Sequence, residues 1–276
     1  MPSITPTSTH PPISLRIPSL KTKLLSGCIG KARAKCSVAI LFLGCLLNLT
    51  PIVQAVPHRL IILRHGEKAN GYALTAIGQQ RALALQAHYL GKNAAQSLFP
   101  DGTAPAAIFA ITLHSLELIS PAAQSWDMPI QLYSVVPGNG CTQSNEVTQL
   151  NQRTRQAAHD ILTNPRWHGK TLVIAWEHDH IAQDALEQQF PNERVTLRQL
   201  LNLDQLPAAC KVPTTWPGDN YDYFWIVDYP NPESPIPNAF TMQKQIFPAP
   251  YQQVPSNDWG QPEPRPAAAQ NTPPAP

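Results

Sequence analysis

The stretch RLIILRHGEK (residues 59–68) joins five mostly apolar residues directly to an arginine, a histidine and a glycine. A short, continuous apolar run that contains β-branched residues is typical of a β-strand buried on both faces. We therefore expect a strand over residues 59–63. Arg64 and His65 then lie at its carboxyl end, so that a cation and an imidazole directly follow a segment of the core.

The rest of the central sequence alternates between strand-like and helix-like segments. Four more apolar runs predict strands, at AAIFAIT (106–112), IQLY (130–133), TLVIAW (171–176) and YFWIVD (223–228). Helical spacing predicts helices over residues 75–91, about 118–125, 145–162 and 181–190. Apolar strands separated by helices indicate a three-layer α/β domain, with a mainly parallel sheet between helices on both faces.

Polar residues follow two of these strands directly. Open sheets of this kind bind ligands beyond the carboxyl ends of their strands. Arg64 and His65 occupy that place after the first strand, and Glu177 and His178 occupy it after TLVIAW. An arginine binds two phosphate oxygens with its planar fork, and a neutral imidazole can act as a nucleophile near neutral pH. The pattern indicates a pocket for a phosphoryl group.

Several motifs resemble the histidine phosphatase superfamily, which includes the phosphoglycerate mutases. They are RHGEK (64–68), LTAIGQQRA (74–82), WEH (176–178) and WPGDNYDYFWIV (216–227), and the resemblance covers roughly residues 56–228. It implies a phosphoglycerate mutase-like fold. It also implies that His65 accepts the phosphoryl group, Arg64 binds the phosphoryl oxygens, and His178 completes the pocket.

One position departs from the family pattern. Members usually supply a second arginine in a pattern like S-x-R-P-x-x-T-x-x-P-x-A, whereas this chain has TLHSLELISPAA (112–123), with His114 at that place. An imidazole donates one hydrogen bond to an oxygen and lacks the guanidinium fork. We expect an adapted or weakened pocket in which Arg64, Glu67 and His114 contact substrate. Three other cations could supply the missing charge, although solvated surface positions are favoured for them: Lys68, Arg153 and Arg155.

No motif identifies the proton donor to the leaving group. A general acid must come within about 3 Å of the leaving oxygen, directly or through one water. Four carboxylates lie next to predicted pocket residues or in the altered loop: Glu67, Glu117, Glu177 and Asp179. We expect Glu177 to be the donor, ahead of Glu67.

A metal site is the alternative reading of the histidines and carboxylates. EHDH (177–180) would join His65 and His168 in such a site. The sequence has neither H-E-x-x-H spacing nor paired cysteines. We therefore predict no metal, and the family resemblance implies no organic cofactor.

These observations predict a phosphomonoesterase that hydrolyses a phosphorylated small molecule through a phosphohistidine at His65. The alternative is a catalytically weakened homologue that binds a phosphorylated or other anionic ligand, or a partner, without turnover. His114 favours this alternative, and the pair of His65 and His178 favours the enzyme. The formal net charge of +2 is too small to indicate nucleic acid as a partner. The sequence predicts no oligomeric state.

The two ends of the chain differ from its centre. Residues 1–55 carry basic residues, then the apolar run SVAILFLGCLL (37–47) and a V-Q-A site, which predict a secretory signal cleaved before Val56 and an exported protein with no membrane span after cleavage. An uncleaved anchor and a transit peptide are alternatives. Residues 56–228 form the predicted domain, and the proline-rich residues 229–276 a mostly extended tail. Cys141 and Cys210 form either one disulfide or two separate thiols.

Overall fold

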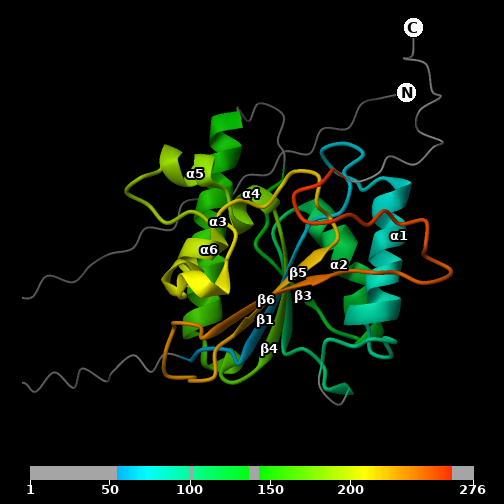
Figure 1. The fold of residues 1–276 in the computed structure, drawn as a ribbon, viewed down its shortest axis with the longest axis horizontal. Coiled ribbons are helices and arrows are strands. Elements are labelled where there is room, and N and C mark those ends of the chain that lie inside the picture. Colours follow the sequence, from blue (N-terminus) through cyan, green and yellow to red (C-terminus); the bar gives the residue numbers. More distant parts are fainter. Residues whose placement is uncertain (1–54, 100–101, 137–142, 263–276) are drawn as a thin grey trace, which may run out of the picture. The chain divides into compact units, whose positions relative to one another are not determined.

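A six-stranded mixed sheet forms the centre of the described chain (Figure 1). The computed structural model describes residues 55–99, 102–136 and 143–262, all within one structural unit, Leu49–Pro276. The order of the strands is β3-β2-β4-β1-β5-β6. Strands β1 to β4 are parallel, whereas β5 runs antiparallel to β1 and β6 antiparallel to β5. The strands are β1 (Arg59–Arg64), β2 (Ala107–Ala110), β3 (Ile130–Leu132), β4 (Thr171–Trp176), β5 (Tyr223–Asp228) and β6 (Ala239–Lys244).

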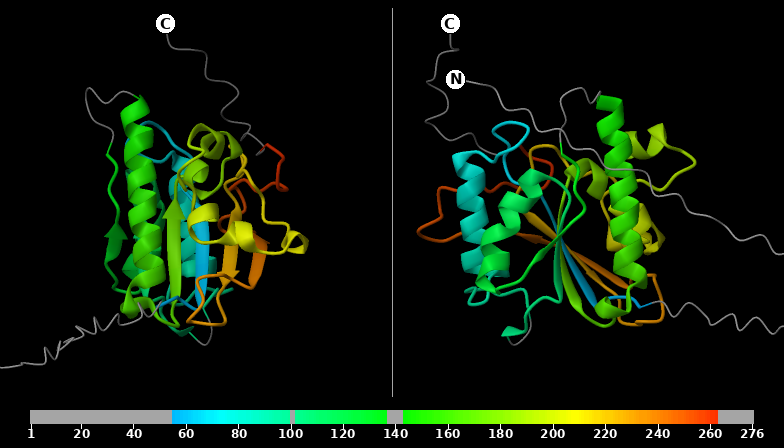
Figure 2. Two further views of the ribbon diagram at one scale, coloured as in Figure 1. Left: turned by 90° about the vertical axis from the view of Figure 1, so that its left-hand side faces the viewer. Right: turned by 180° about the vertical axis from the view of Figure 1, so that it is seen from behind.

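Helices cover both faces of this sheet, which confirms the predicted fold class (Figures 1 and 2). Helices α1 and α2 lie on one face, and α3 and α6 lie on the other. The α-helices are α1 (Ala76–Leu85), which continues as a π-helix over Gln86–Leu90, α2 (Leu113–Ser125), α3 (Gln143–Thr163), α4 (His178–Ile181), α5 (Asp184–Gln189) and α6 (Leu197–Leu200). Single 3₁₀ turns span Pro165–Trp167, Leu203–Gln205 and Ala208–Cys210.

Strand β1 is apolar on both sides because it separates two hydrophobic clusters. Leu60 and Ile62 belong to the cluster with α3, and Ile61 and Leu63 belong to the cluster with α1 and α2. All four side chains are at most 1% exposed. Burying each one stabilises the fold by about 1.5–3 kcal/mol. This burial fixes the position of β1, and therefore of the two residues that follow it.

The LTAIGQQRA motif places α1 directly against the loop that follows β1. Thr75 caps the helix by accepting a hydrogen bond from the Gly78 amide, and its own amide donates to the Glu67 carbonyl oxygen at 2.8 Å. A Cβ atom at Gly78 would lie 2.8 Å from that same carbonyl oxygen. Only glycine permits this approach of helix and loop.

The C-terminal boundary predicted at Asp228 is wrong. Strand β6 pairs with β5 along its whole length, and Phe247 and Val254 are buried in the cluster with α1 and α2. The prolines around β6 do not prevent pairing, because none lies within the strand itself. Residues 229–262 therefore belong to the domain rather than to an extended tail.

Three predictions about the ends and cysteines lie outside the described residues. They concern the leader up to Gln54, the tail beyond Pro262, and the pairing of Cys141 with Cys210. Cys210 itself is half-buried at the end of a 3₁₀ turn. Of the helices in the described ranges, none combines the length and the apolar character that a membrane span requires.

Candidate active site

The carboxyl ends of β1 and β4 lie side by side and bring the predicted strand-end residues together. The two strands pair in parallel with Arg64 opposite Trp176. The His65 amide continues the ladder by donating to the Trp176 carbonyl oxygen at 2.8 Å. Because Glu177 and His178 follow Trp176 directly, the groups expected at one sheet edge meet in one site.

The hydrogen bonds of His65 define its tautomer. Its Nδ1 lies 2.7 Å from the Gly66 carbonyl oxygen, which can only accept, so Nδ1 carries the proton and Nε2 carries the lone pair. Arg64 Nη2 donates to Nε2 at 3.2 Å. Burial holds the pKa of His65 well below its usual range, with Glu177 opposing this shift and Arg64 reinforcing it. His65 is therefore a neutral imidazole whose Nε2 is available for nucleophilic attack.

Arg64 is held by a loop that sequence analysis did not assign to the site. Its Nη1 donates to the carbonyl oxygens of Pro217 at 3.0 Å and Gly218 at 2.7 Å. Its guanidinium carbon lies 3.9 Å from the centre of the Tyr221 ring. One edge of the guanidinium thus binds the loop, while Nη2 faces His65. The signal that could have identified this loop is its place before β5, because β5 is antiparallel to β1 and starts at the edge where β1 ends.

A second segment, the C-terminal strap (residues 255–261), holds this loop. Asn220 donates to Asn257 Oδ1 at 2.8 Å and accepts from the Gly260 amide at 2.7 Å. Asp222 Oδ2 accepts from the Ser256 hydroxyl at 2.8 Å and from the Asn257 amide at 2.9 Å. Asn220 and Asp222 are both fully buried. The strap therefore determines the position of the loop that determines the position of Arg64.

Glu177 lies between a lysine, a threonine and the nucleophile. Its Oε1 accepts from Thr112 Oγ1 and its Oε2 accepts from Lys68 Nζ, both at 2.8 Å. Its Oε2 is also 3.4 Å from His65 Nε2. Burial opposes ionisation, but the Lys68 ammonium and the Thr112 hydroxyl outweigh it and hold the pKa of Glu177 well below its usual range. Glu177 is therefore a carboxylate at neutral pH, not a resting proton donor.

His178 faces the nucleophile from the start of α4. Its Nδ1 lies 3.2 Å from His65 Nε2, and its Nε2 lies 3.2 Å from Asp179 Oδ1. Burial and then the Arg64 charge lower the pKa of His178 to about 4, although Asp179 and Glu177 oppose this shift. The side chain is neutral at neutral pH, and an anion beside it would favour the protonated form.

The same side chains offer three atoms to a cation. The ligand atoms of His65, Glu177 and His178 lie within 4.8 Å of one another. However, Arg64 Nη2 lies 3.2 Å from His65 Nε2, and Lys68 Nζ lies 2.8 Å from Glu177 Oε2. Two positive groups so close to the same atoms repel a metal ion and favour an anion.

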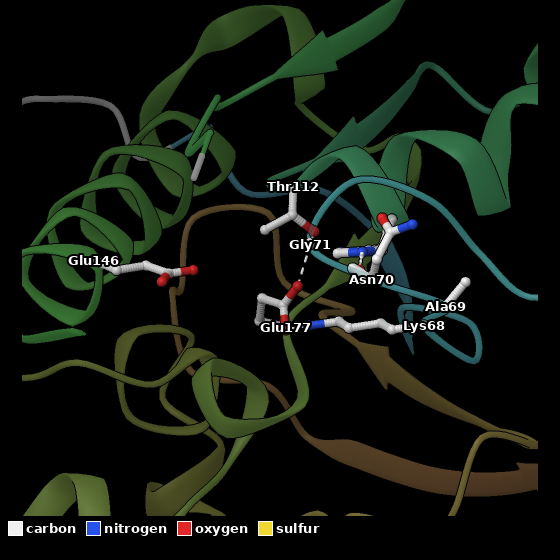
Figure 3. Close-up of a pocket in the computed structure, with 8 residues that line it drawn as sticks. Lys68, Ala69, Asn70, Gly71, Thr112, Glu146 and Glu177 are labelled. Carbon is white, nitrogen blue, oxygen red and sulfur yellow. Dashed lines mark hydrogen bonds and ion pairs between the residues drawn. The ribbon is translucent and has the colours of Figure 1, made fainter. Parts of the chain in front are cut away.

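A cavity of about 360 Å³ opens beside Glu177 and Lys68 (Figure 3). Its other lining residues are Ala69, Asn70, Gly71, Thr112, His114 and Glu146. The volume is at the small end of ligand pockets, which range from about 300 to 1,000 Å³. The cavity adjoins the nucleophile through Glu177, whose Oε2 lies 3.4 Å from His65 Nε2.

His114 reaches the site but does not replace an arginine. Its ring centre is 6.3 Å from that of His65, and it lines the cavity. Its Nε2 donates to the Asn70 carbonyl oxygen at 2.6 Å, so this donor is already engaged. His114 thus holds the loop around Asn70. Besides Arg64, the structure brings Lys68 close to the nucleophile, through its ion pair with Glu177. Lys68 is one of the three cations predicted as possible replacements.

Glu67 has a different role from the one predicted. Its carboxylate forms a two-pronged ion pair with the buried Arg81 of α1, with a shortest distance of 2.7 Å. It does not line the described cavity. Glu67 therefore connects the loop after β1 to α1, and the carboxylate that faces the nucleophile is Glu177.

The remaining candidates lie at other positions. Glu117 accepts from the Leu74 amide and from Gln79, which stabilises the start of α1. Arg153 bonds Gln156, and Arg155 pairs with Glu193 at 2.6 Å. These two arginines lie on the surface of α3, as predicted.

Comparisons with known proteins add little to this site. No family model matches the chain, and no curated protein matches it. Solved structures that align with it include the mycobacterial glucosyl-3-phosphoglycerate phosphatase, with 11% identity, a TM-score of 0.36, and coverage of 68% of this chain and 98% of that one. Another is a putative phosphohistidine phosphatase SixA from Agrobacterium tumefaciens, with 14% identity, a TM-score of 0.34, and coverage of 68% and 97%.

Proposed function

We propose that the chain is a phosphomonoesterase of the histidine phosphatase type, with His65 as the phosphoryl acceptor. The observation that carries this proposal is the buried, neutral His65, whose Nε2 lies 3.2 Å from both Arg64 Nη2 and His178 Nδ1. The guanidinium of Arg64 and the imidazole of His178 flank the nucleophile, and both can donate hydrogen bonds to the oxygens of an incoming phosphoryl group. The substrate class is a phosphorylated small molecule.

In the first step, His65 Nε2 forms a bond to phosphorus while the bond from phosphorus to the leaving oxygen breaks. Arg64 Nη2 donates to one phosphoryl oxygen. The negative charge of the phosphoryl group favours protonation of His178, whose Nδ1 then donates to a second oxygen. These bonds strengthen as charge shifts onto the phosphoryl group, which lowers the barrier.

The leaving oxygen must gain a proton as it departs. Glu177 is ionised before substrate binds. A phosphomonoester keeps one proton below about pH 6, and Glu177 relays that proton to the leaving oxygen. We therefore expect kcat/KM to fall as the pH rises through about 6.

In the second step, water attacks phosphorus and the bond from phosphorus to His65 Nε2 breaks. Glu177 accepts the proton that the water loses and passes it to the departing phosphate. The histidine returns to its neutral form, and the net reaction consumes one water for each ester hydrolysed.

Lys68 supplies the second cation in this proposal. Its Nζ lies 2.8 Å from Glu177 Oε2, which in turn is 3.4 Å from His65 Nε2. The ammonium is thus at the margin of the phosphoryl position, and a half-exposed lysine can turn from Glu177 towards an added anion. It takes the place of the arginine expected where His114 stands.

Steady-state hydrolysis of an aryl phosphate tests the proposal. The purified chain should turn over between about pH 4 and 8, and His65→Ala should abolish the activity. His159→Ala, which removes an exposed imidazole from α3, is the matched control and should leave the rate unchanged. Activity that survives in His65→Ala would contradict the proposal.

The second candidate is a protein that binds an anionic ligand without turnover. The engaged Nε2 of His114 favours it, because the pocket lacks a second guanidinium. If this candidate holds, vanadate or phosphate binds the wild-type chain, binding weakens in Arg64→Met, and no ester is hydrolysed. Turnover in wild type excludes it.

We also propose that the chain is exported and that residues 1–55 are removed. The basic segment and the apolar run SVAILFLGCLL before Val56 support this proposal. Amino-terminal sequencing of the protein from its native host should begin at Val56. A mature protein that retains the apolar run would favour the anchor instead.

A further inference from the structure

The two sides of the active-site cavity differ in their charges. On one side, the ammonium of Lys68 and the carboxylate of Glu177 neutralise each other at 2.8 Å. Thr112 adds a hydrogen bond to the same carboxylate. These groups face the phosphoryl position near His65. They therefore leave no excess charge on that side of the cavity before substrate binds.

The opposite side carries the carboxylate of Glu146. Figure 3 shows this side chain reaching from α3 towards the cavity, across from Lys68 and Asn70. Glu146 is partly buried. No hydrogen bond or ion pair joins it to another side chain of the described ranges. Its negative charge is therefore not balanced within the cavity. The first turn of α3 stabilises a carboxylate, but it does not require one that faces a ligand cavity.

We infer that the enzyme acts on phosphomonoesters whose leaving group carries a protonated amine, which pairs with Glu146. The inference rests on the proposed function. When the phosphoryl group lies against His65 and Lys68 turns towards it, Glu177 keeps its hydrogen bond from Thr112 and takes up the proton that it relays. The leaving group extends into the small cavity, where Glu146 is then the unbalanced charge among the lining residues. A partly desolvated carboxylate attracts an ammonium group more strongly than a carboxylate in open water does, and it repels another carboxylate. Charge on the leaving group therefore decides specificity.

Three esters of similar size test this inference: 2-aminoethyl phosphate, 2-hydroxyethyl phosphate and phosphoglycolate. They place an ammonium, a hydroxyl or a carboxylate at the far end of the leaving group. We expect kcat/KM to fall in that order, with about a tenfold preference for the amine over the hydroxyl, which corresponds to one charge-assisted contact. The Glu146→Gln variant should lose this preference for the amine, while its kcat/KM for the hydroxyl compound is unchanged. Glu193→Gln, which removes a surface carboxylate, is the control.

Each outcome separates this inference from the proposed function. If wild type hydrolyses the three esters equally, or prefers phosphoglycolate, the inference is wrong and the phosphatase assignment stands. The inference is also wrong if Glu146→Gln keeps the preference for the amine. If wild type hydrolyses the aryl phosphate but none of the three esters, the inference is wrong and the phosphatase assignment stands. If it hydrolyses neither the aryl phosphate nor the esters, the phosphatase assignment fails. Calorimetric binding of the same compounds then tests Glu146 alone, because only the amine should bind more weakly to Glu146→Gln than to wild type.

Discussion

Two regions of the molecule build the active site by different means. The strand-end region consists of Arg64 and His65 after β1 together with Glu177 and His178 after β4, and its groups face the reacting atoms. The closing region consists of loop residues 217–222 and the C-terminal strap, and it contacts Arg64 rather than the nucleophile. The first region provides chemical groups and the second provides their orientation. Substitutions in the two regions should therefore affect different measurements.

After the complete loss of activity expected in His65→Ala, the largest effect is expected in the strand-end region as well, from His178→Ala. This change removes a group that donates to the phosphoryl oxygens, and such a loss costs about 100- to 1,000-fold in kcat. The free energy of unfolding should fall little, because the side chain is partly exposed. Its pKa is lowered to about 4, so it is uncharged at neutral pH and its removal breaks no ion pair. Steady-state kinetics and chemical denaturation of the same preparation check both expectations. If the variant loses stability and activity together, His178 has a structural role rather than a catalytic one.

A pH effect on stability should originate beside the strand-end region, at His180 of α4. Burial lowers the pKa of His180 to about 4, with Glu177 and Asp179 opposing the shift. The unfolded chain binds this proton near pH 6.5 and the folded chain does not, so stability is lost as pH falls from about 6.5 to about 4. His180 alone should cost about 2–3 kcal/mol between about pH 7 and pH 4.5.

Urea denaturation of wild type and His180→Gln at the two pH values measures this contribution. The glutamine can keep a hydrogen bond to Asn151, which accepts from the imidazole at 2.9 Å. The variant should lose less stability on acidification than wild type. An equal loss in both proteins would show that His180 titrates normally in the folded state.

Lys68→Met tests the proposed second cation. Removing one charged hydrogen bond at about 1.5–3 kcal/mol should lower kcat/KM about 10- to 100-fold. Lys68→Arg should restore most of the activity, because it returns the charge. His114→Arg should raise kcat/KM above wild type if the pocket is short of positive charge. Full activity in Lys68→Met would leave the pocket with Arg64 as its cation and would exclude the proposed role.

The smallest effect is expected in the closing region, from Asn257→Ala. The change leaves buried Asn220 without one of its partners, which costs about 1–2 kcal/mol of stability. It should also loosen the loop that holds Arg64 and lower kcat/KM by about tenfold, mainly through KM. Gln252→Ala, at an exposed position shortly before the strap, is the control. A loss of stability without any change in KM would show that the strap does not position Arg64.

The sequence allowed prediction of the strand-end region. In the closing region, residues 216–227 resemble a family motif, but the contact of this loop with Arg64 and the strap that holds it were not predicted. The apolar runs at β1 and β4 and the residues directly after them predicted where Arg64, His65, Glu177 and His178 meet. By contrast, the bond of Asn220 to Asn257 joins residues 37 apart in segments without a hydrophobic period, so no local pattern signals it. Strand β6 was missed for the same reason, because β5 supplies its pairing partners.

The direction in which a side chain points was a second feature that the sequence did not predict. Glu67 and Glu177 each adjoin a pocket residue, yet Arg81 of α1 binds the first and Lys68 and Thr112 bind the second. Adjacency in sequence does not state which way a side chain turns. The same limit applies to the start of α2, which the structure places at Leu113 because Thr112 caps it. His114 therefore lies in the first turn of a helix rather than in a loop.

The most direct test of the account is the position of a trapped phosphoryl group. The chain is mixed with a labelled phosphomonoester and quenched in alkali, and the phosphorylated residue is identified by mass spectrometry and phosphorus NMR. Because the Gly66 carbonyl oxygen holds the proton on Nδ1, the account predicts phosphorylation of His65 at Nε2 and no label in His65→Ala. A label on His65 Nδ1, on another residue, or retained in His65→Ala would contradict it.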